Sequence, residues 1–137
     1  MLDKSFDNEN LEVVYKVMTY LFLEGTATYV RYGSAFSIES EKINEAVNLF
    51  QRIIESENEE FDKSKLEKIL NIGLKSNGPF YTLGQYMAKI IDETYGNDKL
   101  AACLEKGSPE FFKLFINTDD KQTFDPEQKR VFQKILL

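Results

Sequence analysis

The sequence predicts an all-α fold, a single domain of about six or seven helices around a buried central helix. Apolar residues recur at spacings of three and four along almost the whole chain, which is the period of a helix with one buried side. No segment alternates apolar and polar residues for more than a few positions, as a half-buried strand would. Glycine, proline and capping residues separate the apolar segments and mark the ends of the helices.

The first predicted helix spans residues 11–32 and is apolar on nearly every side. Its apolar residues form one stripe of Leu11, Val14, Tyr15, Met18, Phe22, Gly25 and Tyr29, and a second stripe of Val13, Val17, Tyr20, Leu21 and Ala27. A helix of this kind is surrounded by other helices. We therefore expect residues 11–32 to be the most buried helix, ending near Gly33, which can adopt the left-handed conformation that closes helices.

Two more helices are predicted before residue 78. Ser40 is the candidate cap of the second helix, and the third begins near Ser64. Between them lies an acidic run, residues 55–60, which we interpret as a solvated turn. A calcium loop needs a turn-forming glycine among its oxygen ligands, and this run contains none.

The second half of the chain is divided by glycine and proline. Pro79 suits the first position of a fourth helix, which Gly96 ends. On the side of this helix that carries Tyr81, the small residues Gly84 and Ala88 allow another helix backbone to come close. Three shorter helices follow, and their ends are marked by Asn97, Gly107, Ser108–Pro109 and Asp125–Pro126.

Length and composition describe one globular domain, residues 1–137, whose last helix covers about 125–137. The net charge of −6 and a pI near 4.8 argue against nucleic-acid binding, because the basic residues are scattered rather than clustered. Residues 13–30 are too polar for a membrane span. No signal peptide is visible, so we expect a cytoplasmic protein. The single cysteine, Cys103, excludes an internal disulfide and is predicted to be a small buried residue.

Glu24 is the residue of the first helix that stands out chemically. It lies in the run Leu21-Phe22-Leu23-Glu24-Gly25, and a buried carboxylate is unfavourable unless it is paired, protonated or bound to a metal. Its helix neighbours three and four positions away include no basic residue. A structural role would require tyrosine hydroxyls, or a Lys or Arg from another helix, to meet the carboxylate. A metal site is the functional alternative.

Two segments resemble the C-terminal part of gluzincin-type zinc metallopeptidases. They are Glu-Gly-x-Ala-x-Tyr, beginning at Glu24, and Gly-Pro-Phe-Tyr-x-x-Gly-x-x-Met-Ala, beginning at Gly78. The likeness covers roughly residues 10–116 and is greatest to a bacterial family of zinc-dependent peptidases whose function is unknown. The resemblance implies that Glu24 is the third zinc ligand. It also implies that Tyr81 is a catalytic phenol that hydrogen-bonds the oxyanion formed during peptide hydrolysis.

The chain departs from that pattern in two ways. It contains no histidine, and the resemblance requires two of them, in an H-E-x-x-H helix, as zinc ligands. The position four residues after Glu24, often acidic in such enzymes, is Thr28. We therefore expect no metal or other cofactor in the isolated chain, and zinc only where the missing ligands are supplied.

Three interpretations follow from these departures. The chain is a helical domain related to the C-terminal half of a peptidase and inactive by itself, or it is a non-catalytic module that binds a peptide or a partner helix. In the third interpretation it is one part of an active peptidase, completed by histidines from elsewhere. The expected partner is a peptide or a protein, and the oligomeric state stays open.

Overall fold

A computed structural model describes residues 9–33, 40–55, 60, 62–75, 78–119 and 123–136. These residues form seven helices and no strand. The helices are α1 (Glu9–Tyr32), α2 (Ser40–Glu55), α3 (Lys63–Gly73), α4 (Pro79–Tyr95), α5 (Asn97–Lys106), α6 (Ser108–Asn117) and α7 (Pro126–Leu136). The all-α prediction is confirmed. Most of the acidic run 55–60 lies outside the described residues, and so does the residue that precedes α2.

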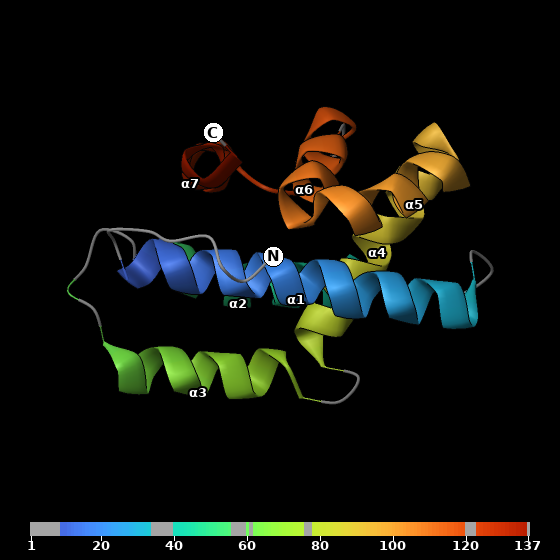
Figure 1. The fold of residues 1–137 in the computed structure, drawn as a ribbon. Coiled ribbons are helices and arrows are strands. Elements are labelled where there is room, and N and C mark those ends of the chain that lie inside the picture. Colours follow the sequence, from blue (N-terminus) through green and yellow to red (C-terminus); the bar gives the residue numbers. More distant parts are fainter. Residues whose placement is uncertain are drawn as a thin grey trace.

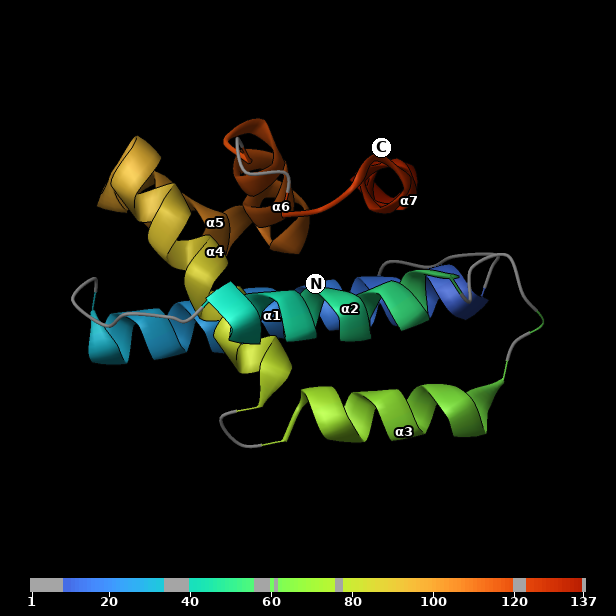
Figure 2. The same ribbon diagram turned by 180° about the vertical axis from the view of Figure 1, so that it is seen from behind.

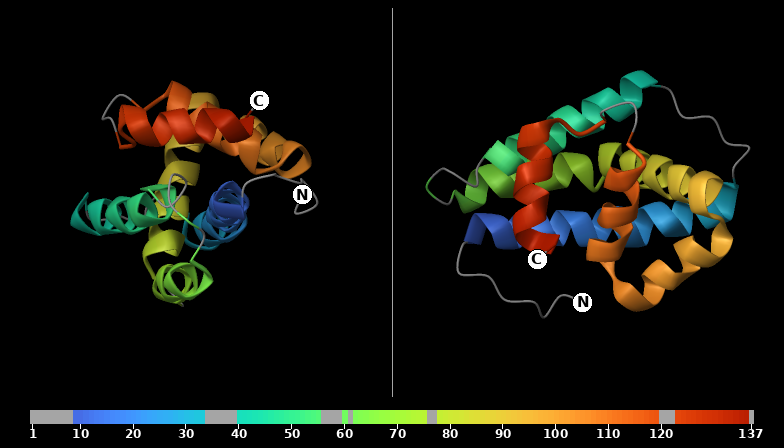
Figure 3. Two further views of the ribbon diagram at one scale, coloured as in Figure 1. Left: turned by 90° about the vertical axis from the view of Figure 1, so that its left-hand side faces the viewer. Right: turned by 90° about the horizontal axis from the view of Figure 1, so that it is seen from above.

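Helix α4 occupies the centre of the structure. It begins below α1, passes behind it and ends beside α5 (Figure 1), and the view from the opposite side shows α2 in front of it (Figure 2). Seen end-on, α4 stands between α1 and α2, with α3 on one side of this pair and α5, α6 and α7 on the other (Figure 3, left). Helix α4 therefore contacts α1, α2, α3, α5 and α6.

Residues 11–32 include more buried residues than any other described helix, as expected, but other helices do not surround α1 on nearly every side. Along α1, an outward stripe that includes Tyr20, Leu23 and Ala27 is exposed, whereas α4 is exposed only at its last three residues, 93–95. Tyr20 and Ala27 belong to the second apolar stripe of the sequence. An apolar stripe shows that a helix side can be buried, but it does not show that another helix of the same chain covers it.

Helices α1 and α4 touch through their backbones at two glycines. A Cβ atom added to Gly25 would lie 2.6 Å from the carbonyl oxygen of Gly84, and one added to Gly84 would lie 2.9 Å from the Cα of Gly25. Rotating a side chain cannot relieve either overlap, because the opposing atoms belong to the backbone. The close approach predicted for the stripe of Tyr81, Gly84 and Ala88 is confirmed at Gly84.

Phenylalanine rings join α5–α7 to the rest of the protein. Phe132 of α7 is fully buried against Phe50 of α2, Phe112 of α6 and Phe124, with ring centroids 5.0–5.6 Å apart. Phe22 of α1 meets Phe111 of α6 at 5.1 Å. Tilted and edge-to-face ring pairs of this kind stabilise a core beyond the area that they bury.

The helix boundaries follow local signals, with one correction. Gly96 (φ 94°) and Gly107 (φ 89°) each end one helix and begin the next, so the glycine backbone occupies the cap positions predicted for Asn97 and Ser108. Asp125 caps α7 as expected: its Oδ1 accepts from the Gln128 backbone N–H at 2.8 Å, while Gln128 Oε1 accepts from the Asp125 N–H at 2.9 Å.

Among the described helices, none is long and apolar enough to cross a membrane. The cytoplasmic location stays a prediction.

We expect Gly84→Ala to lower the free energy of unfolding by more than about 2 kcal/mol, although alanine favours a helix, because the new methyl group would overlap the α1 backbone. Thr94→Ala, on the exposed end of the same helix, is the control and should change stability by less than about 0.5 kcal/mol. Urea denaturation followed by circular dichroism measures both. Equal stabilities of Gly84→Ala and the wild type would contradict the backbone contact.

Candidate functional site

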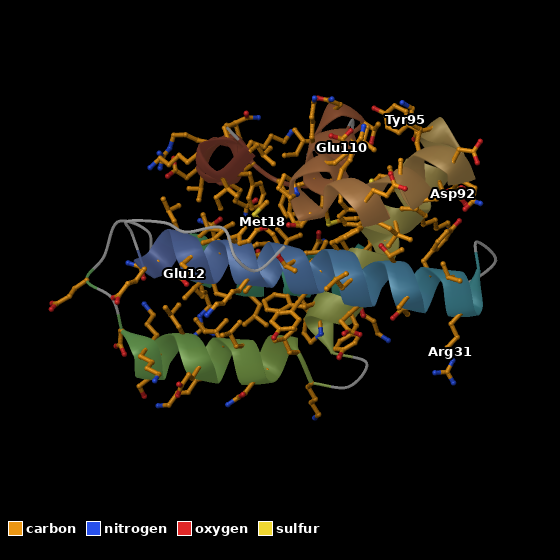
Figure 4. The ribbon with its side chains drawn as sticks, viewed as in Figure 1. Glu12, Met18, Arg31, Asp92, Tyr95 and Glu110 are labelled. Atoms are coloured by element: carbon orange, nitrogen blue, oxygen red, sulfur yellow. The ribbon has the colours of Figure 1, made fainter. Side chains whose placement is uncertain are left out.

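The glycine contact between α1 and α4 positions both candidate residues. Glu24 directly precedes Gly25 on α1, and Tyr81 lies three residues, almost one turn, before Gly84 on α4. Arg31 follows Glu24 by seven residues and therefore lies on nearly the same edge of α1. Figure 4 shows Arg31 pointing towards the side of α1 where α3 lies and where α4 begins. The two candidate positions thus each lie within about one helical turn of the Gly25–Gly84 contact.

The Glu24 side chain is half-buried, and its carboxylate has no hydrogen bond or ion pair with any described residue. Thr28, found where peptidases often have an acid, donates from its hydroxyl to the carbonyl oxygen of Glu24 at 2.7 Å. Its hydroxyl is therefore used within the helix. The tyrosine or basic partner that a structural role would require is not found within the part of the chain that is described.

Tyr81 lies in the first turn of α4 and is also half-buried. Its hydroxyl has no hydrogen-bond partner in the described parts of the chain, and no hydrogen bond joins it to Glu24. That the two side chains face one cleft stays a prediction.

A tyrosine–carboxylate pair does join α1 to α4, but at another position. The hydroxyl of Tyr29 donates to Asp92 Oδ2 at 2.5 Å, one turn beyond Gly25 on α1 and two turns beyond Gly84 on α4. Figure 4 shows Asp92 above the C-terminal half of α1, on the side away from Arg31. Sequence reasoning included Tyr29 among the apolar positions and missed Asp92, because nothing in the sequence pairs residues 63 positions apart.

Zinc does not fit the described residues by themselves. They contain no group of three or more His, Cys, Asp or Glu side chains that could hold a metal ion. Cys103 is buried, as predicted, and its thiol donates to the Lys99 carbonyl oxygen at 3.4 Å. Burial, assisted by the nearby Glu110 carboxylate, raises the pKa of the Cys103 thiol to about 11. Metals and electrophiles require the thiolate, so this cysteine is a poor ligand and a poor nucleophile at neutral pH.

Cys103 should react slowly with Ellman's reagent while the protein is folded. Raising the thiol pKa from 9.0 to about 11 lowers the thiolate fraction at pH 8 by about a hundredfold, and burial slows the reaction further. The labelling rate should be compared between native and urea-unfolded protein, and it should rise with pH in the native protein up to about pH 11. Native labelling as fast as unfolded labelling would contradict the buried thiol.

Glu24→Gln should change the free energy of unfolding by less than about 0.5 kcal/mol, because the substitution keeps the shape and strands no partner. Asp92→Asn is the matched control. It weakens the hydrogen bond from Tyr29 to a carboxylate and should cost about 1–3 kcal/mol. Denaturant unfolding at pH 7 compares the two. A larger loss in Glu24→Gln than in Asp92→Asn would reveal a structural partner of Glu24.

The comparison with protein families identifies the chain at the family level. Residues 1–122, which include α1 to α6, match the model of a family described as zinc-dependent peptidases. The match extends beyond the predicted range 10–116 on both sides. No curated protein and no solved structure matches the chain. The predicted resemblance to such a family is confirmed, and the gluzincin relationship stays a prediction. Because the match covers most of its residues, the chain belongs to the family described as "Putative zinc dependent peptidase (DUF5700)".

Proposed function

We propose that this chain is the helical part of a gluzincin-type zinc peptidase and is catalytically incomplete by itself. One observation carries the proposal: a member of a family described as zinc-dependent contains no histidine among its 137 residues. Peptidase zinc sites combine a carboxylate with imidazole nitrogens. The nitrogen ligands must then come from a polypeptide segment outside this chain.

In this proposal Glu24 is the zinc ligand that the chain contributes, and Tyr81 donates a hydrogen bond to the substrate. Glu24 is a half-buried residue whose carboxylate pairs with no described residue, and it lies beside the Gly25–Gly84 contact; both features support its assignment. Two helices whose backbones touch hold nearby side chains at fixed positions, as a metal ligand and a substrate-binding phenol require.

A non-catalytic binding module is the second candidate function. The exposed apolar residues Tyr20, Leu23 and Val30 on α1 favour it, since an apolar side of a helix can bind a peptide or a partner helix without any chemistry. Zinc binding separates the two candidates, because only the peptidase interpretation assigns a metal to Glu24.

We expect calorimetry at neutral pH to show no tight one-to-one zinc binding to the isolated chain, since one carboxylate cannot replace a set of two histidines and a glutamate. The protein encoded by the longest open reading frame that includes this chain, or a complex of this chain, should bind one zinc ion per site if it also contains an H-E-x-x-H helix. In that assembly Glu24→Gln should weaken zinc binding at least tenfold, as measured by competition with a chromophoric chelator.

Glu93→Gln is the matched control, because Glu93 is an exposed carboxylate on α4 and should leave zinc affinity unchanged. A micromolar one-to-one site in the isolated chain that disappears in Glu24→Gln would overturn the claim of incompleteness. Full zinc affinity of Glu24→Gln in the complete assembly would remove Glu24 from the site.

A further inference from the structure

A cleft of about 390 Å³ lies between α2 and the start of α7, on elements that carry neither Glu24 nor Tyr81. Figure 3 (right) shows the chain entering α7 above α2. The volume is within the range of small-ligand sites, roughly 300–1,000 Å³. The cleft is lined by Asn44, Val47, Asn48, Gln51, Thr123, Asp125 and Gln128. The last three follow residue 122, where the family match ends, so the family relationship does not account for this cleft.

Side-chain amides dominate the lining of the α2–α7 cleft. Asn44, Asn48 and Gln51 contribute three of them from α2, and Gln128 contributes a fourth from α7. Asp125 is the single charged residue among the described lining residues, so an anionic ligand would meet no Lys or Arg there. Each amide offers one acceptor oxygen and two donor hydrogens. The lining therefore suits an uncharged ligand that carries both donors and acceptors.

The amides of α2 are not used by the described fold. Those of Asn44 and Asn48 form no hydrogen bond with any described residue. Gln51 Nε2 donates to Glu55 Oε1 at 3.0 Å, whereas Gln51 Oε1 is buried and accepts from no described residue. A buried acceptor without a donor is unfavourable. A ligand N–H group in the cleft would relieve this cost once the Gln51 amide turns towards it.

The walls of the cleft are held in place by the core. Phe50 of α2 packs against Phe124 and against Phe132 of α7, with ring centroids 6.4 and 5.6 Å apart. The reciprocal hydrogen bonds between Asp125 and Gln128 fix the start of α7. A cleft that is already formed loses little conformational freedom when a ligand binds, which favours binding.

The spacing of the amides matches an extended peptide. Asn44 and Asn48 are four residues apart, which separates them by about 6.0 Å along the axis of α2. In an extended chain, backbone N–H and C=O groups that point to the same edge recur every second residue, about 6.6 Å apart. The two amides can therefore pair with alternate residues of one peptide. A sugar ring would gain from stacking on an aromatic side chain, and the described lining residues include none.

We propose that the α2–α7 cleft binds an extended peptide segment through the backbone N–H and C=O groups of that segment, with Asn44 and Asn48 as the hydrogen-bonding residues. Backbone hydrogen bonds give affinity without reading side chains, so the cleft should accept many sequences. The proposal requires no metal and does not rest on the proposed function. It adds a peptide-binding site on α2 and α7, away from the candidate residues of α1 and α4.

Nuclear magnetic resonance tests the proposal. The full chain, labelled with nitrogen-15, is titrated with a pool of random octapeptides whose ends are acetylated and amidated. We expect saturable shifts of the side-chain amide signals of Asn44 and Asn48. Methylating every backbone nitrogen of the peptides removes their N–H donors and should abolish these shifts. Asn48→Ala should raise the Kd of the unmethylated pool at least about fivefold, because it removes the hydrogen bonds of one amide.

Asn71→Ala is the matched control, since Asn71 is also an exposed asparagine within a helix but lies on α3, and it should leave the Kd unchanged. Glu24→Gln should also leave the Kd unchanged. Five results would each overturn the proposal: equal binding of the methylated peptides, an equal Kd for Asn48→Ala and the wild type, a loss of binding in Glu24→Gln, saturation of the cleft by maltose but not by the peptides, or no saturable shift at millimolar peptide.

The same titration keeps this inference separate from the proposed function. If the peptides bind in the cleft while the complete assembly takes up no zinc, the peptide site stands and the peptidase proposal fails. If zinc binds through Glu24 while the signals of Asn44 and Asn48 do not shift, the peptidase proposal stands and the peptide site fails.

Discussion

The backbone contact between Gly25 and Gly84 is the constraint on which the rest of the structure depends. Without side chains at these two positions, α4 can pass directly against α1 and still have α2 on its other side. Because α4 runs across this pair, the chain continues with α3 on one side and α5–α7 on the other. The Tyr29–Asp92 hydrogen bond joins the same two helices farther along. The contact and the bond together fix the crossing of α1 and α4.

The helices beyond α4 are held by different means. Gly96 and Gly107 allow turns of one residue between helices, because their positive φ angles are accessible to glycine at little cost. Asp119, whose side chain is 2% exposed, accepts hydrogen bonds from the backbone N–H groups of Thr123 and Phe124 and lies 3.7 Å from Lys129 Nζ. These bonds place Phe124 in the aromatic core and direct the chain into α7.

Local signals in the sequence were enough to predict the helices, whereas their arrangement depended on contacts that the sequence does not display. Gly33, Pro79, Gly96 and Asp125 mark helix ends because each acts through its own backbone or a neighbour three residues away. The central place of α4 could not be predicted, since Tyr20 and Ala27 of α1 look as apolar as buried residues. The small residues around Gly84 did indicate a close helix contact, but not which helix would make it.

The candidate site was predictable as a pair of positions and not as an arrangement of atoms. The resemblance selected Glu24 and Tyr81, and the helix contact explains why two residues 57 positions apart lie near one crossing. A paired carboxylate such as Asp92 stabilises the contact that it makes. Glu24 makes no such contact among the described residues, so the described fold gains nothing from its charge. In the function that we propose, this charge serves a zinc ion whose other ligands lie outside the chain.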